Sequence, residues 1–118
     1  MSLHITPEMM EATYELLKLT PPFKRWKLPD ADDIVFGVFN TTTHSAEYYL
    51  RRGDDRHVIR INGNWCGSLP RLIVNMAHEM IHLRLRIACA GDYGQHGKEF
   101  KRLAAQVCRH HVIDPKGF

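Results

Sequence analysis

The first apolar pattern in the chain repeats at helical spacing. Thr6-Pro7-Glu8 combines an N-cap residue, a proline at the first helical position and an acidic first turn. Apolar side chains then follow at positions 9, 10, 14, 16 and 17. This pattern predicts a helix over about 6–19. Pro21-Pro22 ends it, and we expect the charged segment up to Asp33 to be a connecting loop anchored by Trp26.

The pattern then changes to short runs rich in β-branched and aromatic residues. Three such runs cover residues 34–39, 47–51 and 57–61. Turn-prone residues separate them, at 40–43 and 53–55. Short connections of this kind predict a three-stranded antiparallel meander over about 34–62. Three strands need a helix packed on one face to be stable.

Helical spacing returns in the last part of the chain. Ser68 can cap a long helix with Pro70 in its first turn, which we expect to run to about residue 90. Glycines at 91 and 94 break the pattern, and a final helix is predicted over about 97–110. The order α-β-β-β-α-α, without a linker or repeat, predicts one α+β domain over residues 1–118.

Composition narrows the class of protein. The formal net charge is +3, and the basic residues are scattered, which permits a nucleic-acid partner without arguing for one. The three cysteines are widely spaced, unlike a disulfide framework or a zinc knuckle. No apolar stretch approaches the roughly 18 residues of a membrane span, and no signal run opens the chain. We therefore expect a cytoplasmic protein; its oligomeric state is not readable from the sequence.

The candidate metal-binding and catalytic residues lie in the helix that is predicted over 68–90. His78-Glu79-Met80-Ile81-His82 is an HExxH motif, in which two histidines four residues apart project from one helix face and can reach one metal ion. Glu79 lies about 100° around the helix from His78, where a carboxylate can serve as general base on water instead of binding the metal. With eight histidines in the chain, a chance match is the alternative.

The placement of the motif argues against a chance match. An apolar stripe runs along the same helix, formed by Leu69, Leu72, Met76, Met80, Leu83 and Ile87. His78 and His82 fall nearly opposite this stripe, whereas histidines that merely fill a core would more often lie within it. The face that carries the motif is therefore expected to line a cleft.

A catalytic zinc site normally takes three protein ligands and leaves one position open. His96 follows a glycine-containing loop and opens the final helix, from which it can fold back over the metal. Glu99, one turn further on, would make a His-His-Glu site instead. The remaining candidates are Cys66, Asp92, His110 and His111.

The two-part motif resembles the SprT-like family, which includes the Spartan proteases that act on DNA–protein crosslinks. The resemblance rests on the motif at 78–82 and on His96-Gly97-Lys98-Glu99-Phe100 after a gap of thirteen residues, 83–95. It implies that His96 is the third zinc ligand, that Glu79 is catalytic and that Phe100 packs the final helix. Many members carry a C-terminal zinc ribbon or DNA-binding tail; neither is evident before Phe118, so we expect a bare catalytic core.

Together these observations predict a zincin-like domain that hydrolyses peptide bonds. One Zn²⁺ on His78, His82 and His96 would polarise the scissile carbonyl, with Glu79 as general base. The expected partner is a protein or peptide substrate, with DNA-associated proteins as one class and no membrane. Two alternatives stay open: a non-catalytic, zinc-stabilised module that binds protein or DNA, and a zinc hydrolase of small amides.

Overall fold

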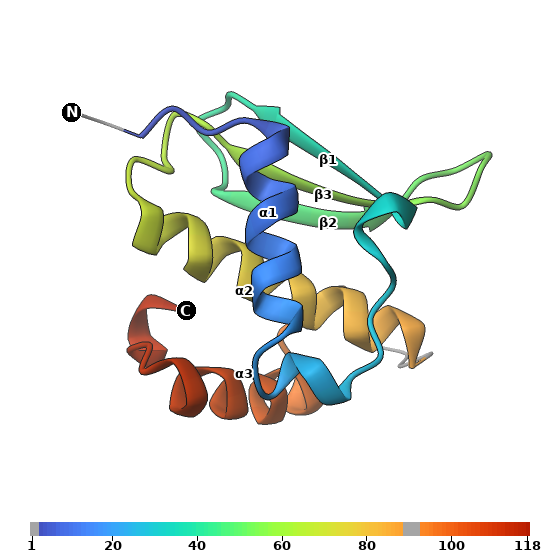
Figure 1. Ribbon diagram of the computed structural model, residues 1–118, viewed down its shortest axis with the longest axis vertical. Coiled ribbons are helices and arrows are strands. Elements are labelled where there is room, and N and C mark those ends of the chain that lie inside the picture. The colour runs from blue at the N-terminus through green and yellow to red at the C-terminus, as the bar shows by residue number, and fades with distance from the viewer. Residues whose placement is uncertain (1–2, 89–92) are drawn as a thin grey trace.

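The computed structural model describes residues 3–88 and 93–118 (Figure 1). Among these residues it contains three α-helices and a three-stranded sheet. The helices are α1 (Pro7–Lys18), α2 (Leu69–Ile87) and α3 (Lys98–His111), and the strands are β1 (Ile34–Phe39), β2 (Ala46–Leu50) and β3 (His57–Asn62). The predicted α+β class and order of elements are confirmed.

The first two helices begin where their capping residues predict. The Thr6 side chain accepts a hydrogen bond from the Met9 amide at 3.2 Å, and the Ser68 hydroxyl accepts one from the Arg71 amide, also at 3.2 Å. These bonds satisfy backbone donors that have no partner within the helix. At its other end, α2 was predicted to run to about residue 90, but it ends at Ile87. Residues 89 and 90 lie outside the described part of the chain.

The sheet is mixed, so the predicted antiparallel meander is wrong. Strand order is β1-β3-β2, with β3 in the centre, parallel to β1 and antiparallel to β2. The loop that follows β1 must therefore pass over the end of β3 before β2 begins. Neighbouring strands lie about 4.8 Å apart, so the loop bridges roughly 10 Å, which six residues can span.

Asn62, at the end of the central strand, explains how this crossing is held. Its side-chain amide donates hydrogen bonds to the carbonyls of Thr41 at 2.7 Å and His44 at 2.9 Å, both in the crossing loop. Its side chain is fully buried. A buried amide that satisfies two loop carbonyls fixes the loop over β3, and the pattern of apolar positions carries no sign of this contact.

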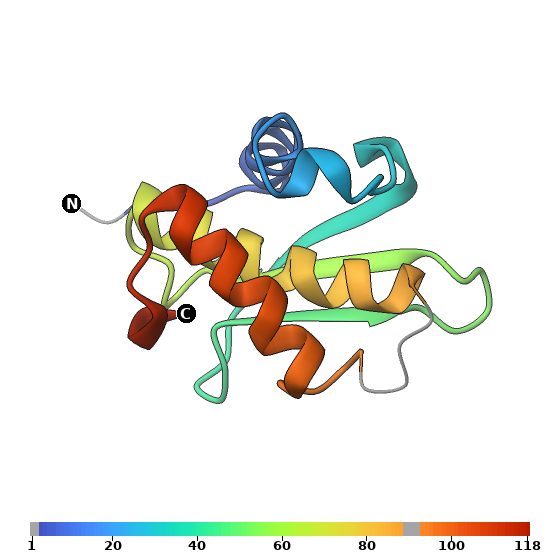
Figure 2. The ribbon, with the colours of Figure 1, turned by 90° about the horizontal axis from the view of Figure 1, so that it is seen from below.

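The helix α2 is the centre of the molecule. Figures 1 and 2 show it between the sheet and α3, and it packs against β2, β3, α1 and α3. Its middle positions Leu72, Met76, Met80 and Leu83 are fully buried, which confirms the core of the predicted stripe. The ends of the stripe do not join the core, since Leu69 is 56% exposed and Ile87 is 36% exposed.

The segment between α1 and β1 is more structured than a simple loop. It contains two short 3-10 helices, Phe23–Arg25 and Ala31–Asp33, and a third one, Pro115–Gly117, follows α3. Trp26 anchors the segment as expected: its ring is buried edge-on against Phe23 at 4.9 Å between centroids. Within the described residues, no helix has the length and apolar character that crossing a membrane requires.

Candidate metal centre

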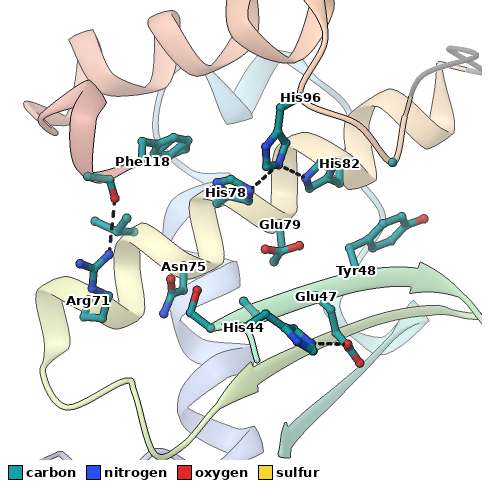
Figure 3. A pocket seen from close by; sticks show the side chains of 15 residues that line it. His44, Glu47, Tyr48, Arg71, Asn75, His78, Glu79, His82, His96 and Phe118 are labelled. Carbon is teal, nitrogen blue, oxygen red and sulfur yellow. Dashed lines mark hydrogen bonds and ion pairs between the residues drawn. The ribbon is translucent and has the colours of Figure 1, made fainter. Parts of the chain in front are cut away.

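Three histidine side chains from two separate segments meet above α2 (Figure 3). The Nε2 atom of His96 lies 3.1 Å from Nε2 of His78 and 3.3 Å from Nε2 of His82. Each residue offers one nitrogen, and the three nitrogens lie within 4.8 Å of one another. Tetrahedral coordination at 2.0–2.1 Å would place ligand nitrogens roughly 3.3 Å apart, so this donor set fits a metal ion such as zinc.

Backbone groups fix the orientation of two of these rings. Nδ1 of His82 lies 2.7 Å from the carbonyl oxygen of Tyr93, to which it can donate a hydrogen bond while Nε2 faces the cluster. The His78 ring hydrogen-bonds the backbone of Phe118. Histidines that bind metals usually donate their second ring nitrogen to such a partner, which sets the tautomer and the direction of the ligand atom.

Phe100 on α3 supports all three imidazoles. Its ring centroid lies 4.9 Å from that of His78, 4.8 Å from that of His82 and 4.4 Å from that of His96. The side chain is 5% exposed, so it closes the cluster on the side of α3. Phe100 thus packs the final helix as predicted, and it does so against the candidate ligands themselves.

The surroundings favour uncharged imidazoles. Burial, together with the neighbouring rings of His82 and His96, lowers the pKa of His78 to about 4. Burial also lowers the pKa of His82. A neutral imidazole has a free nitrogen lone pair for a metal ion, whereas a protonated one does not. The chemistry of the donor set therefore fits a metal as well as its geometry does.

Glu79 lies on the side of α2 that faces the sheet, below the three rings (Figure 3). It is 4% exposed, and no cation among the described residues forms an ion pair with it. Burial, and then the carboxylate of Glu47, raise its pKa to about 8. A bound cation would act in the opposite direction, since positive charge favours the carboxylate. Glu79 can therefore exchange a proton near neutral pH.

A cleft of about 420 Å³ contains this group, with α2 on one side and β2 on the other. Consecutive residues 44–48 line it, so the backbone of the edge strand as well as its side chains reaches the cleft. Within it, the Glu47 carboxylate lies 2.8 Å from Nε2 of His44 and forms an ion pair with Arg60 at 2.9 Å. Neither Glu47 nor Tyr48 was predicted as a site residue, because no sequence motif includes them.

Asn75 is a third cleft residue that the motifs did not predict. It lies three positions before His78 and four before Glu79, and therefore on the same side of the helix. Helical spacing counted back from the motif could have identified it.

The other proposed third ligands do not join the cluster. Glu99 forms an ion pair with Arg102 at 2.8 Å, and His111 lies 3.0 Å from the Thr20 hydroxyl. Cys66 and His110 are absent from the metal-binding group, which among the described residues consists of the three histidines. Asp92 lies outside the described part of the chain.

Comparison with known proteins agrees with this arrangement. The model of the SprT-like family matches residues 24–116, from just after α1 to the last 3-10 helix. Searches of curated proteins and of solved structures gave no match. The family match covers well over half of the chain and includes the three histidines, Glu79 and the edge strand. The chain therefore belongs to the SprT-like family.

Proposed function

We propose that this protein is a zinc-dependent peptidase that uses Glu79 as its general base. The observation that carries the proposal is the position of a buried carboxylate, which has no ion-pair partner among the described residues, beside three converging imidazoles in one cleft. Membership of the SprT-like family, whose members are generally zinc metallopeptidases, supports the same conclusion.

The proposed roles follow from the chemistry of each side chain. His78, His82 and His96 would hold the zinc through their Nε2 atoms, and a bound zinc would supply Lewis-acid polarisation of the scissile carbonyl and a lower pKa for water. The Glu79 carboxylate takes a proton from the attacking water and passes it to the leaving nitrogen. Its buried position beside the three imidazoles places the carboxylate where both transfers can occur.

The number of donors supports catalysis over a structural metal site. Structural zinc is usually closed by four protein ligands, while catalytic zinc keeps one position for water or substrate. Among the residues that the structure describes, three donors converge. The open side of the group faces the cleft, where a substrate can approach.

The edge strand supports a peptide as the substrate rather than a small amide. Within the described sheet β2 pairs on one side only, with β3, and its other edge borders the cleft. An extended peptide can add to such an edge through main-chain hydrogen bonds. A small amide would leave this edge unused.

Replacement of the proposed base tests the function. For Glu79→Gln we expect a loss of about 10²–10⁴-fold in cleavage of casein or a peptide panel, the range typical of general acid–base catalysis, with zinc content unchanged. Glu15→Gln is a matched control, since Glu15 is exposed on α1 and far along the chain from the cleft. Cleavage by Glu79→Gln at the rate of the parent protein would refute the assignment.

A further inference from the structure

A second hollow lies on α3, beside the candidate metal centre. It is a groove of about 580 Å³, lined by α3 and by the segment that follows it, which contributes Ile113, Pro115 and Phe118. Most of the side chains that line it are apolar. Ligand sites in proteins are typically concave, mostly apolar and about 300–1,000 Å³ in volume. The groove therefore has the size and the character of a binding site.

Two rows of side chains on α3 give the groove its shape. Residues four apart on a helix lie above one another on the same face. The inner row consists of Phe100, Ala104 and Cys108, and the outer row of Lys101, Ala105 and Arg109. Phe100 and Cys108 are buried, whereas the whole outer row is exposed. Each row has an alanine in its middle, and these two small side chains leave the space that a ligand can fill.

The groove shares a border with the cleft that contains the metal centre. His96 and Phe118 line both hollows, and Figure 3 shows them on the side of the cleft nearer α3. Because His96 is a candidate metal ligand, the groove begins directly beside the position of the metal. Consecutive Cα atoms of a peptide are 3.8 Å apart. When a peptide bond lies at the metal, a side chain that enters the groove therefore belongs to a residue next to that bond.

The charges at the rim of the groove restrict what it can take. Neither Lys101 nor Arg109 forms an ion pair with any residue that the structure describes. Both would repel a basic side chain. The apolar floor disfavours any charged side chain, since burial of a charge without a partner is costly. An uncharged apolar side chain meets neither obstacle.

We propose that the groove binds a large apolar side chain of the peptide substrate, at a residue next to the scissile bond. This inference rests on the proposed peptidase function and names the class of peptide that the site takes. Leucine, methionine and phenylalanine are side chains of this kind, and their apolar surface leaves water when they enter the groove. The polar cleft would hold the main chain, while the groove selects the sequence.

Cleavage of a randomised peptide library tests the preference. For the parent protein we expect large apolar residues to be favoured about tenfold over alanine or lysine at one position beside the cleaved bond, because an apolar pocket discriminates single methylene groups by roughly 10–200-fold. Ala105→Phe fills the groove and should abolish this preference while cleavage continues. Ala12→Phe is the matched control, since Ala12 is an exposed helical alanine on α1 that lines neither hollow.

A change of charge at the same position gives the converse result. Ala105→Glu places a carboxylate at the rim of the groove, so lysine should become favoured over leucine and phenylalanine at the position beside the cleaved bond. This variant also serves if Ala105→Phe does not fold. A structural defect would lower cleavage of all peptides alike and would not exchange one preference for another.

A binding measurement separates this inference from the proposed function. In the zinc-loaded Glu79→Gln protein, a labelled alanine–serine peptide with one phenylalanine should bind about tenfold more tightly by fluorescence anisotropy than the same peptide with alanine instead. Adding Ala105→Phe should remove the difference. A parent protein that cleaves no peptide refutes the proposed function, while this comparison still decides the role of the groove.

Three results would overturn the inference. The first is cleavage without an apolar preference, together with equal binding of the two labelled peptides. The second is a preference that Ala105→Phe and Ala105→Glu both leave unchanged. The third is a parent protein that sediments as a dimer and becomes a monomer with Ala105→Phe, which would assign the groove to a second copy of the chain.

Discussion

The two faces of α2 are buried to a similar degree but made of different residues. The face toward the core carries Met76 and Met80, both fully buried and apolar. The face toward the cleft carries Asn75, Glu79 and His82, which are 5%, 4% and 7% exposed. One helix thus holds an ordinary hydrophobic core on one side and an almost equally buried polar site on the other.

This difference shows how stability and function are divided in the domain. Burial of apolar surface stabilises the fold by roughly 25 cal/mol per Å², so the core face contributes to stability. The cleft face opposes it, because burial disfavours the charged forms of Glu79 and His82. The core face therefore supports a site that would not be stable by itself.

The largest effect on both stability and zinc binding is expected from Phe100. Phe100 is buried and contacts all three imidazoles, so Phe100→Ala should lower the free energy of unfolding by about 3–5 kcal/mol. It should also weaken zinc binding, because the rings lose their support. Urea unfolding and a zinc titration measure the two effects. Unchanged zinc affinity in a destabilised variant would show that the rings are held without Phe100.

A change confined to the core face should lower the stability of the fold without preventing zinc binding. Met80→Ala removes a fully buried side chain that lies about 100° around the helix from Glu79 and about 160° from His82. We expect a loss of about 2–5 kcal/mol in the free energy of unfolding, with one zinc still bound per chain. Loss of zinc from the folded variant would mean that the faces are coupled.

In the metal-free protein, the titratable residues of the cleft face should make the free energy of unfolding depend on pH. The pKa of Glu79 rises from 4.5 to about 8 on folding, so its contribution to stability is full below 4.5 and is lost as the pH rises to about 8. The pKa of His78 falls from 6.5 to about 4, so its contribution is full above 6.5 and is lost as the pH falls to about 4.

The variant Glu79→Gln separates the contribution of Glu79 to the pH dependence of stability from that of His78. Between pH 6.5 and 8 the metal-free parent protein should lose roughly 1–2 kcal/mol of stability, and the variant should not. Below pH 6.5 the variant should lose stability through its histidines. Denaturant midpoints measured across this range test both statements, and parallel curves for the two proteins would contradict them.

The smallest effect is expected at the start of the helix. Ser68→Ala removes the N-cap bond to the Arg71 amide and should lower stability by about 1 kcal/mol, as is typical of capping residues. Both faces of α2 lie further along the helix, so the zinc affinity should be unchanged. A thermal melt with and without zinc measures this, and a large loss of affinity would show that the first turn positions the site.

The sequence predicted the elements of this fold better than their arrangement. Caps and prolines are local signals, so α1 and α2 begin within a residue of the predicted start. Strand order is a tertiary property: it depends on a buried asparagine, Asn62, that joins a loop to the end of a neighbouring strand. Short connections suggested a meander, and no local pattern distinguishes the two topologies.

The same division holds for the candidate site. Spacing on one helix brought His78 and His82 together, and the family motif added His96 and Phe100. The carbonyl of Tyr93 that orients His82 could not be predicted, because a backbone group leaves no mark in the sequence. Glu47 reaches the cleft through the packing of β2 against α2, which only the structure shows.

The central claim is that the cleft face of α2 and His96 form a catalytic metal site. A crystal structure of the zinc-loaded protein, with an anomalous map at the zinc edge, tests it most directly. We predict one peak per chain, bound by Nε2 of His78, His82 and His96 and by no fourth protein atom, with Glu79 beside it. A peak closed by a fourth protein ligand, or no peak at these histidines, would contradict the claim.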